Sequence, residues 1–159
     1  MATPKIHPFL WFDTQAEEAM NFYCGVFDNA TIGTVNRYPE SMPGMGGKVM
    51  TAEFDIEGLH ITALNAGPQF KFNEAISLYV DCADQAEVDR YWHALIADGG
   101  EESMCGWLKD RFGLSWQIVP RQLTELMSDP DREKANRTVQ AMLQMRKIVV
   151  ADLEKAAAG

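Results

Sequence analysis

The length and composition of the chain are typical of a folded, soluble protein. Its 159 residues are 47% hydrophobic and 23% charged, which fits one domain or two small half-domains sharing a core and excludes a disordered chain. A net charge of −9 repels phosphate backbones and anionic membrane surfaces, so neither nucleic acid nor a membrane is expected as a partner.

The first half of the chain is predicted to hold one helix and four strands. Residues 7–13 form an apolar strand, and Thr14 then opens a helix with Glu17 three residues on, in the pattern of a capping box. Three more strands are predicted, over residues 30–38, 48–56 and 59–65. The Pro- and Gly-rich stretch 39–47 is a flexible loop, and Glu57–Gly58 is a hairpin turn.

The second half repeats this order after a connector over residues 65–74. A strand over residues 75–81 leads to a second capping box, Asp84 with Glu87, and to a helix that ends near Gly99–Gly100. Strands are predicted over residues 106–112 and 114–119, and a weak signal for a third lies around residues 101–105.

An internal repeat links the two halves. "QAEEAMNFY" from Gln15 returns as "QAEVDRYWH" from Gln85, and "GLHITAL" from Gly58 aligns with "GLSWQIV" from Gly113. The first strands align Asp13 with Asp81. The pattern predicts an α+β fold in which duplicated βαβββ modules, residues 1–66 and 74–121, form one domain over residues 1–121. Neither half alone buries enough apolar surface, so the modules are expected to share a groove.

Residues 122–159 are predicted to be a helical extension. Asp129 is the expected N-cap and Pro130 the first helical residue. An apolar stripe then predicts one long amphipathic helix, with Val139, Met142, Leu143, Val149 and Leu153 on one face. This helix would pack on the core or, as an alternative, on a second subunit in a homodimer.

The cysteines and the N-terminus bear on localisation. Cys24, Cys82 and Cys105 form no CxxC motif, which indicates a reduced, cytoplasmic protein without a disulfide framework. No basic region followed by a long apolar core opens the chain, and no apolar run approaches the roughly 20 residues of a membrane helix. Neither a signal peptide nor a membrane span is therefore expected.

The chain resembles a known superfamily along nearly its whole length. The stretch "FLWFDTQAEEAMNFYCGVF" (9–27) is similar to the first half of vicinal-oxygen-chelate proteins, which include glyoxalases, extradiol dioxygenases and bleomycin-resistance proteins. Residues 64–82, 105–120 and 141–156 resemble its PhnB-like branch, whose members often carry the label 3-demethylubiquinone 3-methyltransferase-like. The resemblance implies a glyoxalase-like half-barrel groove that binds a small molecule. A methyl donor site of the common kind follows the first strand with a Gly-rich turn, whereas "DTQAE" follows it here.

The resemblance also implies where a metal would lie. Active members hold it by four equivalent strand positions, which the internal repeat assigns to His7, Thr62, Ala75 and Gln117. One imidazole and one amide, without a carboxylate, are too few ligands for a divalent cation. The sequence therefore predicts no bound metal and no cofactor, although a shift of one residue would bring in Glu74 or His60.

Strand alternation predicts the lining of the groove. The expected ligand-binding residues on the strands are aromatic or neutral and polar: Trp11, His60, Thr62, Ser77, Tyr79 and Gln117. Asn65, Phe72 and Asn73 are added because the connector between the halves is expected to pass the groove mouth. The opposite face is expected to pack under the helices through Ile61, Ala63, Leu114, Trp116 and Ile118. His7 and His60 are the candidates for a catalytic base. The alternatives are a solvent-facing edge for His7, a structural role for His60, and a turn for Asn65.

Four functions fit this pattern, and the first is favoured by the aromatic groove and the depleted ligand set. It is a metal-free small-molecule-binding protein of the bleomycin-resistance type. The second is a metal-dependent lyase, isomerase or dioxygenase of the glyoxalase type. The third is an enzyme that uses His7 or His60 as a base without a metal. The fourth is a structural partner protein that interacts through its tail.

Overall fold

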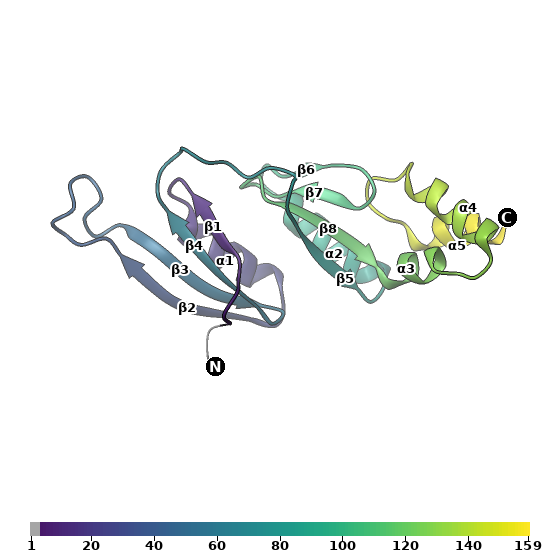
Figure 1. Ribbon diagram of the computed structural model, residues 1–159, viewed down its shortest axis with the longest axis horizontal. Helices are drawn as coiled ribbons and strands as arrows, with labels where there is room; N and C mark the ends of the chain where they lie inside the picture. The colour runs from purple at the N-terminus through teal and green to yellow at the C-terminus, as the bar shows by residue number, and fades with distance from the viewer. Residues whose placement is uncertain (1–3) are drawn as a thin grey trace. The chain divides into compact units, whose positions relative to one another are not determined.

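The computed structural model describes residues 4–159, so the first three residues of the predicted first module lie outside it. The chain forms two compact units, the first ending at Lys71 and the second running over Phe72–Gly159. Each unit contains its own four-stranded sheet, labelled β1–β4 and β5–β8 in Figure 1. The grouping of both modules into one domain, 1–121, stays a prediction.

The first unit is a four-stranded sheet with one helix on it. Its elements, in chain order, are β1 (Phe9–Phe12), α1 (Ala16–Val26), β2 (Ala30–Arg37), β3 (Val49–Ile56) and β4 (Leu59–Asn65). The strand order is β1-β4-β3-β2, with β1 parallel to β4 and the other pairs antiparallel. The parallel β1–β4 pair requires a long crossover, which α1 and the β2–β3 hairpin supply.

The core of the first unit lies between α1 and one face of this sheet. The buried side chains of α1 recur at helical spacing, at Ala16, Ala19, Met20 and Tyr23. Tyr23 stacks on Phe54 of β3 with 6.0 Å between the ring centroids. Ile61 and Ala63 of β4 are fully buried on the same face, as strand alternation predicts.

The second unit repeats this architecture and confirms the predicted βαβββ duplication. Its elements are β5 (Ser77–Cys82), α2 (Gln85–Ile96), β6 (Glu101–Glu102), β7 (Trp107–Lys109) and β8 (Ser115–Pro120). The strand order is β5-β8-β7-β6, the same connectivity as in the first unit (Figure 1). The strand weakly indicated around residues 101–105 is present as β6. The predicted burial of Leu114, Trp116 and Ile118 is also confirmed.

The sheet registers correct one alignment made from the sequence. Phe9 pairs with Thr62 in the first sheet, and Tyr79 pairs with Gln117 in the second. Since Thr62 and Gln117 are equivalent, Phe9 corresponds to Tyr79, and the strand offset is 70 (from 9 to 79). His7 therefore corresponds to Ser77, and Ala75 was the wrong partner. The wrong offset came from aligning Asp13 with Asp81. These residues are not equivalent, because Asp13 follows β1 whereas Asp81 lies inside β5.

The two helices begin differently, so one of the predicted capping boxes is wrong. The N-cap of α1 is Gln15, without a side-chain bond, and the Ala16 N–H donates instead to Asn65 Oδ1 at 2.8 Å. In α2 the predicted N-cap, Asp84, does accept from the Glu87 N–H at 3.0 Å. The Glu87 carboxylate accepts from the Ala83 N–H at 2.7 Å, one residue before the position that a capping box uses.

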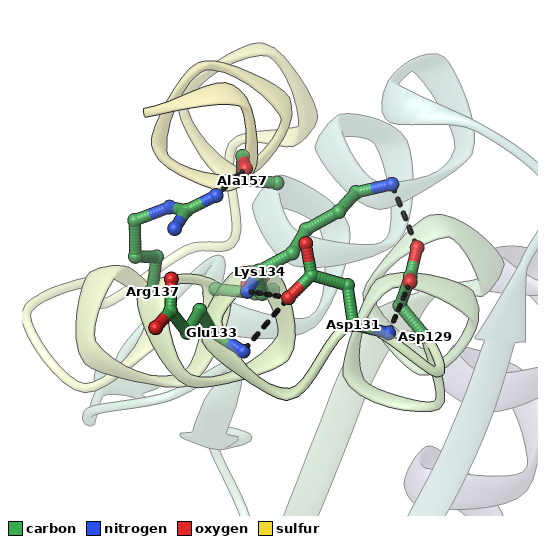
Figure 2. A network of polar contacts seen from close by, with 7 residues as sticks. Asp129, Asp131, Glu133, Lys134, Arg137 and Ala157 are labelled. Carbon is green, nitrogen blue, oxygen red and sulfur yellow. Dashed lines mark hydrogen bonds and ion pairs between the residues drawn. The ribbon is translucent and has the colours of Figure 1, made fainter.

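The tail is three short helices, so the prediction of one long helix is wrong. They are α3 (Arg121–Met127), α4 (Arg132–Met142) and α5 (Val150–Ala158). Asp131 caps α4 by accepting from the N–H groups of Glu133 and Lys134, as Figure 2 shows. The predicted N-cap Asp129 lies two residues earlier, where it pairs with Lys134 at 2.7 Å.

The break between α4 and α5 comes from contacts made far away in the sequence. The carbonyls of Met145 and Arg146 accept from the N–H groups of Cys105 and Gly106, at 2.7 and 2.8 Å. No glycine or proline occurs in residues 143–149 to mark this break. A helix would pair these carbonyls within itself, whereas here they pair with the loop before β7.

The tail helices belong to the second unit and pack at the end of β8. Val119, Leu123, Ile148 and Leu153 form a buried cluster, with Met142 against it. Arg137 of α4 donates to the carbonyls of Ala156 and Ala157 at the end of α5, at 3.1 and 2.6 Å. Within residues 4–159, no helix is both long and apolar enough to cross a bilayer.

Candidate functional site

Most predicted site residues lie on the sheet faces opposite the helices. In the first unit, Phe9 and Trp11 alternate with Leu10 and Phe12, which are buried on the helix side. Phe9 is 58% exposed, and its counterpart Tyr79 in the second unit is 54% exposed. Each unit therefore presents an aromatic side chain at the same place on the face that its helix does not cover.

His7, His60 and Thr62 come together on this face of the first unit. His7 Nδ1 lies 3.3 Å from the Pro4 carbonyl, which only accepts, so this nitrogen carries the proton. His7 Nε2 then accepts from the Thr62 hydroxyl at 3.1 Å. The His7 and His60 rings meet edge to face, 4.8 Å between centroids. Two hydrogen bonds thus fix the orientation of the His7 ring.

His60 has a carboxylate partner that the sequence analysis missed. Asp55 Oδ1 lies 3.2 Å from His60 Nδ1, so the carboxylate accepts the proton of this nitrogen. The other ring nitrogen, Nε2, is buried and has no hydrogen-bond partner among residues 4–159. The predicted hairpin could have identified this partner. Ile56 pairs with Leu59 across the two-residue Glu57–Gly58 turn, which makes Asp55 the cross-strand neighbour of His60.

The second unit carries equivalent groups. Gln117 Nε2 donates to Ser77 Oγ at 2.9 Å, in the positions that correspond to Thr62 and His7. Ser115 occupies the position of His60, at an offset of 55 (from 60 to 115), and is 1% exposed. Its hydroxyl, like His60 Nε2, has no partner within the described part of the chain. Ser115 also lines a pocket of about 140 Å³ beside Trp107.

The other predicted site residues have structural contacts. Trp11 Nε1 donates to the Gly67 carbonyl at 2.8 Å, and its ring packs edge to face on Phe70. Asn73 Oδ1 accepts from the Ala75 N–H at 2.9 Å, a side-chain turn in the connector beside the half-buried Phe72. Asn65 lies on the helix side of its sheet and is 6% exposed.

Charged residues near β7 are paired within the protein, and two of the cysteines have raised pKa values. Asp110 is 2% exposed and accepts from the Trp116 indole N–H at 2.9 Å. A hydrogen bond from Lys109 lowers the pKa of Glu74. Burial, reinforced by Glu87 and Asp81, raises the pKa of Cys82 to about 12, so its thiol stays protonated at neutral pH. Burial also raises the pKa of Cys24.

The residues at the four equivalent positions do not fit a divalent metal. With the corrected register they are His7, Thr62, Ser77 and Gln117, one imidazole, two hydroxyls and one amide. Within each unit the two groups are hydrogen-bonded to each other, His7 with Thr62 and Ser77 with Gln117. Neutral donors that are already paired offer little to a hard or borderline cation. Across residues 4–159, no three His, Cys, Asp or Glu side chains gather in a group that could hold a metal ion.

Comparisons with known proteins identify relatives for most of the chain. Residues 4–119 match the family model described as 3-demethylubiquinone-9 3-methyltransferase. A PhnB protein from Bacillus cereus is 38% identical, with a TM-score of 0.67 over 74% of this chain and 99% of that one. No curated protein matches.

More distant solved structures share the fold. PA1353 from Pseudomonas aeruginosa is 23% identical, with a TM-score of 0.57 over 74% of this chain and 98% of that one. The fosfomycin resistance protein FosX from Mesorhizobium loti is 16% identical, with a TM-score of 0.51 over 73% and 90% of the two chains. At these identities the likeness extends to the architecture alone.

Proposed function

Because this chain belongs to the 3-demethylubiquinone-9 3-methyltransferase-like (PhnB) family of the vicinal-oxygen-chelate superfamily, we propose that it binds a small organic molecule without a metal. The binding surface is the helix-free sheet face of the first unit, around His60, Thr62, Phe9 and Trp11. The second unit offers an equivalent surface around Ser77, Tyr79, Ser115 and Gln117. This is binding of the bleomycin-resistance type.

The observation that carries the proposal is the unpaired Nε2 of His60. A buried polar atom without a partner costs about 1–3 kcal/mol, which a ligand that supplies the missing bond would recover. Asp55 fixes the proton on Nδ1, so in the neutral ring Nε2 is an acceptor. The ligand is therefore a molecule with an O–H or N–H donor and an apolar or aromatic body that packs on Phe9 and Trp11.

The family's name does not by itself assign methyl transfer to this chain. The common methyl donor site needs a Gly-rich turn after the first strand of a parallel sheet. In this chain β1 is followed by "DTQAE", and β1 belongs to a mixed sheet. A metal-dependent lyase, isomerase or dioxygenase reaction is likewise disfavoured by the paired, neutral groups at His7, Thr62, Ser77 and Gln117.

A matched pair of variants tests ligand binding. Chelator-treated protein is screened against small phenols, amides and alcohols by thermal unfolding. A ligand at 100 times its Kd should raise the Tm by about 5–10 °C. His60→Phe should abolish this rise, whereas His93→Phe, the same change at an exposed residue of α2, should keep it. Stabilisation that appears only after a divalent metal is added would refute metal-free binding.

The His60–Asp55 pair also favours a second candidate function, proton transfer without a metal. A carboxylate that orients one imidazole nitrogen leaves the other free to take a proton from a bound substrate. If so, a ligand found in the screen should exchange a carbon-bound hydrogen for deuterium in D2O, as NMR would show. His60→Gln should stop this exchange and Asp55→Asn should slow it. Exchange at the same rate in His60→Gln would refute the role.

Localisation and assembly complete the proposal. The free cysteines Cys24, Cys82 and Cys105 support a reducing, cytoplasmic location. A homodimer also remains part of the proposal, although Met142 and Leu153 of the predicted stripe pack inside the second unit. Leu143 is 45% exposed and is the part of the stripe left for a partner. Light scattering on the full chain measures the oligomeric state directly.

A further inference from the structure

The first unit contains a cavity of about 530 Å³ whose lining residues are separate from those of the His60 face. It lies at the end of the sheet where β1 and β4 stop and α1 begins, and the loop over residues 39–47 covers one side. Neither His7, His60 nor Thr62 lines it. Its volume is in the range of small-molecule sites.

The floor of this pocket is fixed by Asn65. The Asn65 side chain accepts from the Ala16 N–H at 2.8 Å and donates to the Val49 carbonyl at 3.2 Å. The backbone carbonyl of Asn65 accepts from the Tyr38 hydroxyl at 2.6 Å. The side-chain amide of Asn65 thus joins α1 to β3, and its backbone carbonyl holds Tyr38, the residue after β2.

The apolar wall comes from Met42 and Met45 of the loop, together with Val49 and Ala66. Backbone bonds hold the loop in place, including Gly47 N–H to the Tyr38 carbonyl at 3.1 Å. The glycine-rich sequence has a steric reason, since a Cβ on Gly46 would lie 2.5 Å from the Glu40 carbonyl oxygen. The loop is therefore a formed wall, and its methionines give an adaptable apolar surface.

The polar rim is acidic. Asp13 and Glu17 line the pocket, and the guanidinium of Arg37 is 4.0 Å from Glu17, at the limit of an ion pair. The one basic lining residue, Lys48, donates its ammonium group to the Gly44 carbonyl at 2.8 Å. The charged lining is thus two carboxylates and one ammonium group, a formal net charge of −1, beside methionine side chains.

From this combination we propose that the pocket binds a small apolar molecule that carries one positive charge, such as an arylalkylammonium ion. The apolar body would lie against Met42 and Met45, and the ammonium group would pair with Asp13 and Glu17. The site is independent of the proposed function, because it uses none of the groups around His60.

Three matched probes test the charge preference. 4-Phenylbutylamine, 4-phenylbutan-1-ol and 4-phenylbutanoate share one body and are cationic, neutral and anionic at pH 7. Each is titrated into the full chain by ¹H–¹⁵N NMR, which also locates the site. We expect the amine to bind most tightly and the carboxylate least, with shifts at Met45, Ala66 and Gly67. Equal affinities, no binding of the amine at millimolar concentration, or shifts elsewhere would overturn the proposal.

Variants then separate charge from shape. The double variant Asp13→Asn with Glu17→Gln should weaken amine binding about fivefold, as loss of exposed ion pairs does. Glu18→Gln, the same change on the next residue of α1 and outside the lining, should leave it unchanged. Ala66→Trp should block all three probes by filling the pocket. Amine binding that survives Ala66→Trp, or that does not respond to the double variant, would contradict the proposed site, whatever the outcome at His60.

Discussion

At the scale of single residues, the sequence predicted the sheet face on which His60 lies, but not the hydrogen-bond partners of His60 and Asn65. His60 was correctly placed on the face opposite the helices, but its carboxylate partner Asp55 appears only when the hairpin register is known. Asn65 was predicted to bind a ligand or form a turn. In the structure it caps α1 from another element, which no local pattern could reveal because the two residues are 49 positions apart.

Asn65→Ala should destabilise the protein strongly. The change removes two side-chain hydrogen bonds and leaves the Ala16 N–H and the Val49 carbonyl unpaired in a buried place. We expect the free energy of unfolding to fall by about 2–4 kcal/mol, measured by urea denaturation. The control is Asn36→Ala, whose exposed side chain makes one bond to Thr51 and should cost less than about 0.5 kcal/mol. Equal losses in both variants would contradict the capping role.

At the scale of elements, hydrophobic periodicity predicted the helices and strands of the two modules, but not the break in the tail. A single amphipathic stripe predicted one helix, and the structure breaks it where backbone carbonyls pair with the loop before β7. The anchor of this segment is Gln85, the first residue of the repeated "QAE" motif. Its side chain donates to the Ile148 carbonyl at 3.1 Å and accepts from the Val150 N–H at 2.7 Å. A nearby hydrogen bond from Lys147 lowers the pKa of Asp89.

Gln85→Ala should therefore loosen α5 and the segment before it. Loss of the two hydrogen bonds that reach the tail, about 1–2 kcal/mol, should reduce amide-exchange protection over residues 146–158 by about 5- to 30-fold. The internal repeat supplies the control: Gln15→Ala is the same change in the first copy, where the side chain caps nothing. If protection of the tail stays the same in Gln85→Ala, the amide is not the anchor.

At the scale of the whole molecule, duplication was the most informative feature of the sequence. Two copies of one pattern predicted the succession of strands and helix along each half of the chain, including the short β6. The copies have diverged at the sites of interest: a histidine pair with a carboxylate in the first unit, and serine and glutamine in the second. The two-residue error in aligning their first strands shows why a ligand set inferred from sequence symmetry needs the observed register.

We propose that the helix-free sheet face of the first unit, around His60, binds an organic molecule through hydrogen-bonding groups and without a metal. Native mass spectrometry of the full chain, purified without chelator, tests it most directly. We predict mass excess from an organic molecule that is released on unfolding, reduced in His60→Phe and kept in His93→Phe, with no equivalent of a divalent metal. One bound equivalent of zinc, nickel, iron or manganese, lost together with the organic molecule on chelation, would contradict the account.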